Sequence, residues 1–168
     1  GMTNTLTYKG FELSTFLNFV TGNRILNVNR FRLETLGSGS GAGAFPGTSN
    51  NSRNVLDRWT PTNPSQTVAR ASTVYPGDVL SSYQIEDGSF LRLRNVSLAY
   101  NLPTSVAQRI GARLLRVYVS GQNLLTITKY TGYDPEVSRF GQSALNAGID
   151  FGGYPLAKLY TLGLNLGC

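Results

Sequence analysis

The sequence contains no histidine, and only one of its 168 residues is a cysteine. Without histidine the chain lacks the side chain that most often acts as a general base near neutral pH, and no nucleophile has an evident base beside it. The single cysteine, Cys168, is the last residue. Because a disulfide and a cysteine-rich metal site each need more than one cysteine, both are excluded within this chain. We therefore expect no enzymatic activity, no metal site and no cofactor.

Long apolar runs and clustered charge are also missing. No stretch approaches the roughly 18 apolar residues that a membrane-spanning helix needs, and no signal peptide is visible. The net charge is +6, but the basic residues are scattered and form no dense patch, so nucleic-acid binding is not expected. Gly1 in front of Met2 is interpreted as a remnant of tag removal, so the natural protein is expected to be longer.

The chain is rich in glycine and aromatic residues. It contains 19 glycines, nine tyrosines and eight phenylalanines beside a single methionine. This composition favours antiparallel β-structure over helices and predicts an all-β fold.

Several segments alternate between apolar and polar residues with the period of a β-strand. The pattern is clear from Phe11 to Phe19, from Leu115 to Gly121 and from Tyr160 to Leu166. Between Phe90 and Tyr100 it breaks, either because a bulge near Asn95 resets it or because Arg92 and Arg94 lie beyond the apolar band. The expected apolar face comprises Phe11, Leu13, Leu17, Phe19, Val117, Val119, Leu162 and Leu164.

The connections between these segments alternate in length. Lys9-Gly10 is a tight turn, residues 27–87 form a long loop, Pro103 and Gly111 flank one short helical turn, and residues 128–155 form a second long loop. Short periplasmic turns and long extracellular loops are typical of outer-membrane barrels. About five antiparallel strands satisfy this topology, with edge strands at residues 3–8 and 156–166.

Four segments resemble, in the same order, the C-terminal end of the SusC/RagA family of TonB-linked outer-membrane proteins. They are "VLDRWTPTNPS" (55–65), "QIEDGSFLRLRNVSLAYNLP" (84–103), "SGQNLLTITKYTGYDPEVS" (120–138) and "YPLAKLYTLGLNL" (154–166). The resemblance implies that residues 1–168 are a C-terminal segment of a large transmembrane β-barrel, without the plug domain and most of the strands. Such a segment, isolated, is expected to self-associate or to need detergent, because its edges and apolar face are uncovered.

The resemblance also implies a function and partners. Members of this family import glycans or peptides across the outer membrane, draw energy from TonB and carry a SusD-like lipoprotein as a lid. The alternative is a soluble β-domain that binds carbohydrate or protein through aromatic loops.

The two long loops carry the candidate ligand or partner contacts. Aromatic side chains there could stack on a sugar ring or pack against a partner, although an interfacial aromatic girdle and packing within the loop are simpler interpretations. Asp134 and Glu136 are too close in sequence to suggest a glycosidase pair, and Asp134-Pro135 is interpreted as a turn. The candidate contacts are Trp59, Tyr75, Tyr130, Tyr133, Asp134, Glu136 and Tyr154.

Overall fold

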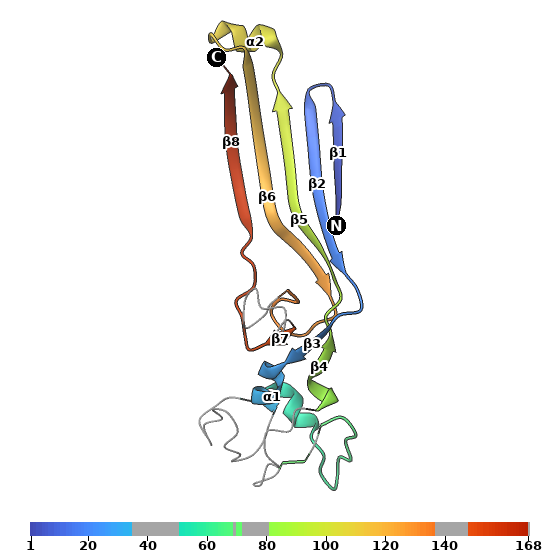
Figure 1. Cartoon of the computed structure of the whole chain (residues 1–168). Helices are drawn as coiled ribbons and strands as arrows, with labels where there is room; N and C mark the ends of the chain where they lie inside the picture. Colours follow the sequence, from blue (N-terminus) through green and yellow to red (C-terminus); the bar gives the residue numbers. More distant parts are fainter. Residues whose placement is uncertain (35–50, 69, 72–80, 137–147, 168) are drawn as a thin grey trace. The chain divides into compact units, whose positions relative to one another are not determined.

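The computed structural model describes residues 1–34, 51–68, 70–71, 81–136 and 148–167. The chain divides into two compact units, whose elements are labelled in Figure 1. The sheet unit comprises residues 1–22, 89–129 and 155–168, and the loop unit comprises residues 23–88 and 130–154.

The sheet unit is one antiparallel sheet of five strands in the order β1-β2-β5-β6-β8 (Figure 1). The expected all-β architecture and number of strands are confirmed, although the last strand begins three residues later than expected. The bounds are β1 (Met2–Tyr8), β2 (Phe11–Val20), β5 (Phe90–Asn101), β6 (Leu114–Thr128) and β8 (Leu159–Gly167).

Both short connections have the expected form. Lys9 and Gly10 join β1 to β2 with positive φ angles of 45° and 85°, the geometry of a tight hairpin turn. Between β5 and β6, Pro103 precedes the short helix α2 (Thr104–Arg109), and Gly111 follows it with a φ of 75°. Among the residues described, no helix combines the length and apolar character needed to cross a membrane.

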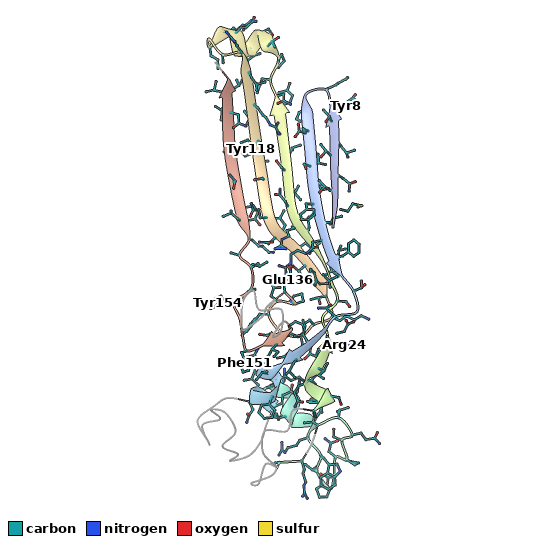
Figure 2. All side chains as sticks on the ribbon, viewed as in Figure 1. Tyr8, Arg24, Tyr118, Glu136, Phe151 and Tyr154 are labelled. Atoms are coloured by element: carbon teal, nitrogen blue, oxygen red, sulfur yellow. The ribbon has the colours of Figure 1, made fainter. Side chains whose placement is uncertain are left out.

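The strand register sorts the side chains of the sheet onto two chemically different faces, because residues paired across antiparallel strands share a face. Side chains leave both sides of the sheet in Figure 2. One transverse row is entirely apolar: Leu6, Leu13, Leu98, Val119 and Leu162. The neighbouring row on the other side is entirely polar: Thr5, Ser14, Ser97, Ser120 and Thr161.

A bulge preserves the two faces where the sequence pattern breaks. Relative to β2, β5 contains one extra residue, Arg94, because Phe16 and Leu17 pair with Asn95 and Leu93. Relative to β6, the extra residue is in β6, where Asn123 and Leu124 lie opposite Arg94. Beyond the bulge, Leu93 pairs with Leu17 on the apolar face, while Arg92 pairs with Asn18 on the polar face. Of the two explanations for the broken alternation, the bulge is therefore confirmed.

The apolar face, which includes all eight residues expected there, is open along the sheet. Leu13 and Leu17 are half-buried, and the other six side chains are between 37% and 79% exposed. Near the β1–β2 turn this face carries Tyr8, Phe11 and Tyr100, and the rings of Phe11 and Tyr100 lie 4.4 Å apart. Tyrosine and phenylalanine at the end of an apolar band are typical of the aromatic girdle of a membrane barrel.

The polar face carries an ion pair that spans three strands. Arg116 Nη2 on β6 lies 2.9 Å from Glu12 Oε1 on β2. The strand between them presents Ala99, which is in register with Glu12 and is 2% exposed. The small alanine leaves room for the arginine side chain to cross β5 and reach its partner.

Tyr118 covers a glycine on the neighbouring strand of the same face. Gly163 is paired with Tyr118, and a Cβ atom at Gly163 would lie 2.2 Å from Cζ of the tyrosine ring. An aromatic ring placed over a glycine in this way replaces the side-chain packing that glycine cannot supply.

We expect Gly163→Ala to destabilise the sheet, because the added methyl group displaces the Tyr118 ring. Overpacking of this kind typically costs about 1 to 3 kcal/mol. The measurement is the temperature at which the folded band of the full-length protein disappears in semi-native electrophoresis. In a Tyr118→Ser background the same alanine should cost much less, and an equal cost in both backgrounds would contradict the packing explanation.

The loop unit contains a second, smaller sheet that the sequence did not predict. Its strands are β3 (Arg24–Asn27), β4 (Ile85–Asp87) and β7 (Ile149–Asp150), in the order β4-β3-β7, with β3 and β7 parallel. Helix α1 (Val28–Glu34) follows β3 directly, and two 3-10 helices, η1 (Arg53–Asp57) and η2 (Ser82–Gln84), complete the described elements. The two long connections thus fold together rather than remaining separate loops.

Candidate functional site

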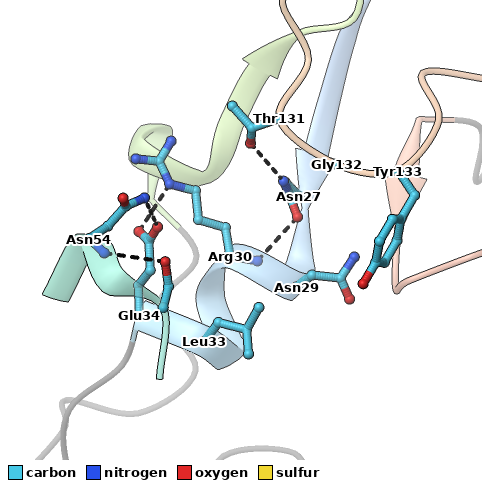
Figure 3. A pocket seen from close by; sticks show the side chains of 10 residues that line it. Asn27, Asn29, Arg30, Leu33, Glu34, Asn54, Thr131, Gly132 and Tyr133 are labelled. Carbon is cyan, nitrogen blue, oxygen red and sulfur yellow. Dashed lines mark hydrogen bonds and ion pairs between the residues drawn. The ribbon is translucent and has the colours of Figure 1, made fainter. Parts of the chain in front are cut away.

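A polar pocket of about 280 Å³ lies in the loop unit and brings together both long connections. It is formed by the start and end of α1, the residues around η1 and the turn after β6, as Figure 3 shows. The lining residues are Asn27, Asn29, Arg30, Leu33, Glu34, Ser52, Asn54, Thr131, Gly132 and Tyr133.

Asn27 and Glu86 join the segments around this pocket. Asn27 is the N-cap of α1, and its Oδ1 accepts a hydrogen bond from Arg30 N at 3.1 Å. Its Nδ2 donates to Glu86 Oε1 at 3.1 Å. The same carboxylate accepts the backbone N–H of Thr131 at 2.9 Å and the Thr131 hydroxyl at 2.8 Å. One buried amide and one carboxylate therefore connect β3, β4 and the turn after β6.

Arg30 and Glu34 neutralise one another beside the pocket. Arg30 Nε lies 3.0 Å from Glu34 Oε2, one helical turn away, and the guanidinium lies 3.9 Å from the centre of the Tyr83 ring. Glu34 Oε1 also accepts a hydrogen bond from Asn54 Nδ2 at 2.7 Å. Partial burial raises the pKa of Glu34, but hydrogen bonds from Asn54, Tyr83 and Arg30 outweigh it, so the pKa lies below its ordinary value of 4.5.

The lowered pKa of Glu34 predicts that acid loosens helix α1. A carboxylate whose pKa is lower in the folded state than in the unfolded state makes its full contribution to folding stability above the unfolded-state pKa, near 4.5. That contribution is lost as the pH falls through the folded-state pKa. We expect amide protection of α1, corrected for intrinsic exchange rates, to hold from pH 7 to 5 and to decline in more acidic buffer. Glu34→Gln cannot titrate and should show a smaller acid-dependent loss; an equal loss in both proteins would assign the effect to another group.

Tyr130 and Asp150 form a buried pair elsewhere in the loop unit. Tyr130 is 6% exposed, and its hydroxyl donates to Asp150 Oδ2 at 2.5 Å. Burial and the neighbouring Asp150 carboxylate raise the pKa of Tyr130 far above its ordinary value, so the phenol stays protonated and remains a donor. Asp150 Oδ1 accepts the backbone N–H groups of Gly152 at 2.7 Å and Gly153 at 3.3 Å. This pair fixes the chain that follows β7.

The remaining candidate contacts fall into different environments. Tyr133 lines the pocket and is 75% exposed, while Tyr154 is 97% exposed and lies outside the pocket lining. Trp59 is also exposed. Tyr75 lies outside the residues that the structure describes.

The pair Asp134 and Glu136 forms a local turn. Asp134 is buried, and its Oδ1 accepts the backbone N–H of Glu136 at 2.9 Å, which confirms the turn expected at Asp134-Pro135. Over the described parts of the chain, no group of three or more acidic, histidine or cysteine side chains gathers where it could hold a metal ion.

Sequence reasoning missed most of the pocket. Asn27, Asn29, Arg30 and Asn54 were not candidates, because isolated polar residues in a long connection form no pattern. The one available signal was an asparagine placed before a helical segment, which is a common N-cap.

Comparison with known proteins identifies related chains along the whole sequence, although no family model matches it. TonB-dependent receptor P3 of Formosa agariphila is 39% identical over 170 residues, which cover 99% of this chain and 16% of the relative. TonB-dependent receptor SusC of Bacteroides thetaiotaomicron is 39% identical over 94 residues, or 54% of this chain and 8% of the relative. The chain therefore spans about a sixth of the length of the first of these relatives.

Solved structures superimpose on nearly the whole chain. The structure of the RagAB peptide transporter superimposes with a TM-score of 0.74 and 30% sequence identity, covering 95% of this chain and 16% of the other. The RagAB peptide importer in the closed-closed state gives a TM-score of 0.74, also at 30% identity.

Proposed function

Because this chain is homologous to the C-terminal part of SusC/RagA-like TonB-dependent receptors, we propose that it forms barrel wall and extracellular loops in an outer-membrane importer of glycans or peptides. In the full-length protein the sheet unit contributes five strands to the barrel, with the apolar face toward lipid and the polar face toward the lumen. The loop unit contributes to the extracellular mouth.

The observation that carries this proposal is the pair of adjacent transverse rows in the sheet. One row is wholly apolar and exposed or half-buried, and the next is wholly polar. A soluble sheet would cover such an apolar face with a second layer, whereas lipid covers it in a barrel. The alternative of a soluble carbohydrate-binding domain gains no support from the relatives.

The partners follow from the same relationship. TonB supplies the energy that opens the transport path, and a SusD-like lipoprotein covers the extracellular mouth. The proposal assigns the chain no catalytic role, since the relatives are named as receptors and transporters. Among the candidate contacts, the exposed rings of Trp59, Tyr133 and Tyr154 are suited to meet ligand or partner, while the buried Tyr130 and Asp134 support the loops.

Cell fractionation of the full-length protein tests this function. It should be recovered in the outer-membrane fraction, require detergent for extraction and migrate differently before and after boiling. A SusD-like lipoprotein should be retained with it during purification in mild detergent. Recovery as a detergent-free soluble monomer would overturn the proposal.

A further inference from the structure

One end of the sheet unit carries a surface in which exposed apolar and basic side chains are mixed. It is built by helix α2 and by the tight turn between β1 and β2, which lie at the same end of the sheet (Figure 1). The backbone N–H of Asn101, the last residue of β5, donates to Gly10 O in that turn at 2.8 Å. The two connections are therefore joined, and their exposed side chains belong to one surface.

Helix α2 exposes apolar side chains to its surroundings. Ala107 is completely buried, whereas Val106 and Ile110 are 39% and 60% exposed. Arg109 follows Val106 by three residues and Ile110 follows it by four, so the three side chains lie on one side of the helix. Exposed apolar side chains beside a cation are typical of segments that lie in the interface between a membrane and water.

Three exposed cations belong to this surface. Arg109 ends α2, Arg113 precedes β6 and Lys9 lies in the turn after β1. The side chains of the two arginines make no hydrogen bond or ion pair with another described residue. Lys9 Nζ lies 5.3 Å from the centre of the Tyr8 ring, which belongs to the apolar face. A cation thus comes directly after the aromatic end of the apolar face, where lipid headgroups begin.

The charge at this end of the sheet is not balanced by acidic side chains. Glu12 is the only acidic residue in residues 1–22, 89–129 and 155–168, and it is paired with Arg116 at 2.9 Å. Anionic lipid headgroups are complementary to such a surface. An anionic polysaccharide would meet the same cations, but it would not account for the exposed Val106 and Ile110.

We propose that α2 and the β1–β2 turn bind anionic phospholipid headgroups in the membrane leaflet that faces the periplasm. Val106 and Ile110 enter the interface, while Arg109, Arg113 and Lys9 meet lipid phosphates. The inference rests on the proposed barrel function, which places the short connections on the periplasmic side. This contact helps to set the depth of the barrel in the bilayer.

Fluorescence quenching in the reconstituted full-length receptor tests the proposal. A fluorophore is attached to Ser105→Cys, an exposed position on α2, in a receptor whose native cysteines are replaced by serine. The bilayer is phosphatidylcholine, into which phosphatidylglycerol or phosphatidylcholine with a nitroxide near the headgroup is titrated. We expect labelled phosphatidylglycerol to reach half-maximal quenching at a mole fraction at least about fivefold lower than labelled phosphatidylcholine.

Charge variants show whether the arginines cause this preference. The pair Arg109→Gln and Arg113→Gln should remove most of it, whereas Arg109→Lys and Arg113→Lys should keep it because the charge remains. The matched control is the pair Arg53→Gln and Arg70→Gln, which removes the same charge from exposed positions in the loop unit and should leave the preference unchanged.

Three results would overturn the proposal. They are equal or absent quenching by the two labelled lipids, a glutamine pair on α2 and β6 that behaves like the control pair, and loss of the preference when soluble peptidoglycan fragments are added. The last result would assign the cations to a polysaccharide. Any of these results in a receptor that still fractionates with the outer membrane would refute the headgroup contact and leave the importer function standing.

Discussion

Receptors in which Val119 is replaced by arginine are expected to reach the outer membrane in much smaller amounts than the wild type. Val119 lies on the apolar face between Leu98 and Leu162, and its side chain is 48% exposed. A lipid-facing arginine costs about 2 to 4 kcal/mol near the middle of the bilayer. This is a large part of the roughly 5 to 15 kcal/mol by which folded proteins are stable. The measurement is the amount of heat-modifiable receptor in the outer-membrane fraction.

The adjacent residue provides the control. Ser120 points to the polar face, between Ser97 and Thr161, so Ser120→Arg places the same charge in the lumen. We expect this variant to assemble in nearly normal amounts. Equal losses for Val119→Arg and Ser120→Arg would show that the two faces are wrongly assigned.

The second large effect is expected from Glu86→Ala in the loop unit. Its carboxylate accepts hydrogen bonds from the buried Asn27 amide and from the backbone and hydroxyl of Thr131, and lies 3.6 Å from Arg30. Alanine leaves these donors without their acceptor. We expect the local opening free energy of β3 and β4 to fall by about 3 kcal/mol. Hydrogen exchange of their amides in the detergent-solubilised receptor measures this change.

Removal of a solvent-exposed carboxylate from the same unit separates this effect from a general change in charge. Asp57 is exposed at the end of η1, and Asp57→Ala should leave the exchange of β3 and β4 unchanged. If Glu86→Ala also left their exchange unchanged, the network around Glu86 would not hold the loop unit together.

The sheet unit could be predicted from the sequence because its strands are long and one face is mostly apolar. Alternation from Phe11 to Phe19 identifies β2, and alternation from Tyr160 to Leu166 identifies β8. The tight turn at Lys9-Gly10 then indicates that β1 pairs with β2. Even the break near Asn95 was informative, since a bulge is what restores the two faces.

The loop unit could not be predicted in the same way. Strands β4 and β7 have three and two residues, which is too short for any periodicity to be recognised. The parallel pairing of Leu26 with Ile149 joins segments far apart in sequence, and no local signal records it. The site shares this limitation: Tyr133 was a candidate because it is aromatic, whereas Asn29 matters only through the neighbours that folding gives it.

The path by which the chain leaves and re-enters the sheet bears on how receptors of this kind diversify. Gly22 N donates to Ser89 Oγ at 3.0 Å, and Gly88 N donates to Asn23 O at 3.0 Å. The insert between β2 and β5 therefore begins and ends at hydrogen-bonded positions, as inserted domains do when their termini lie close together. Exchange of this insert can leave the pairing of β2 with β5 intact, but it separates β3 from β7 and the Glu86 carboxylate from Thr131. Residues 23–88 and 130–154 therefore have to change together if the loop unit is to stay folded, whereas the strands of the sheet unit can keep their pairing.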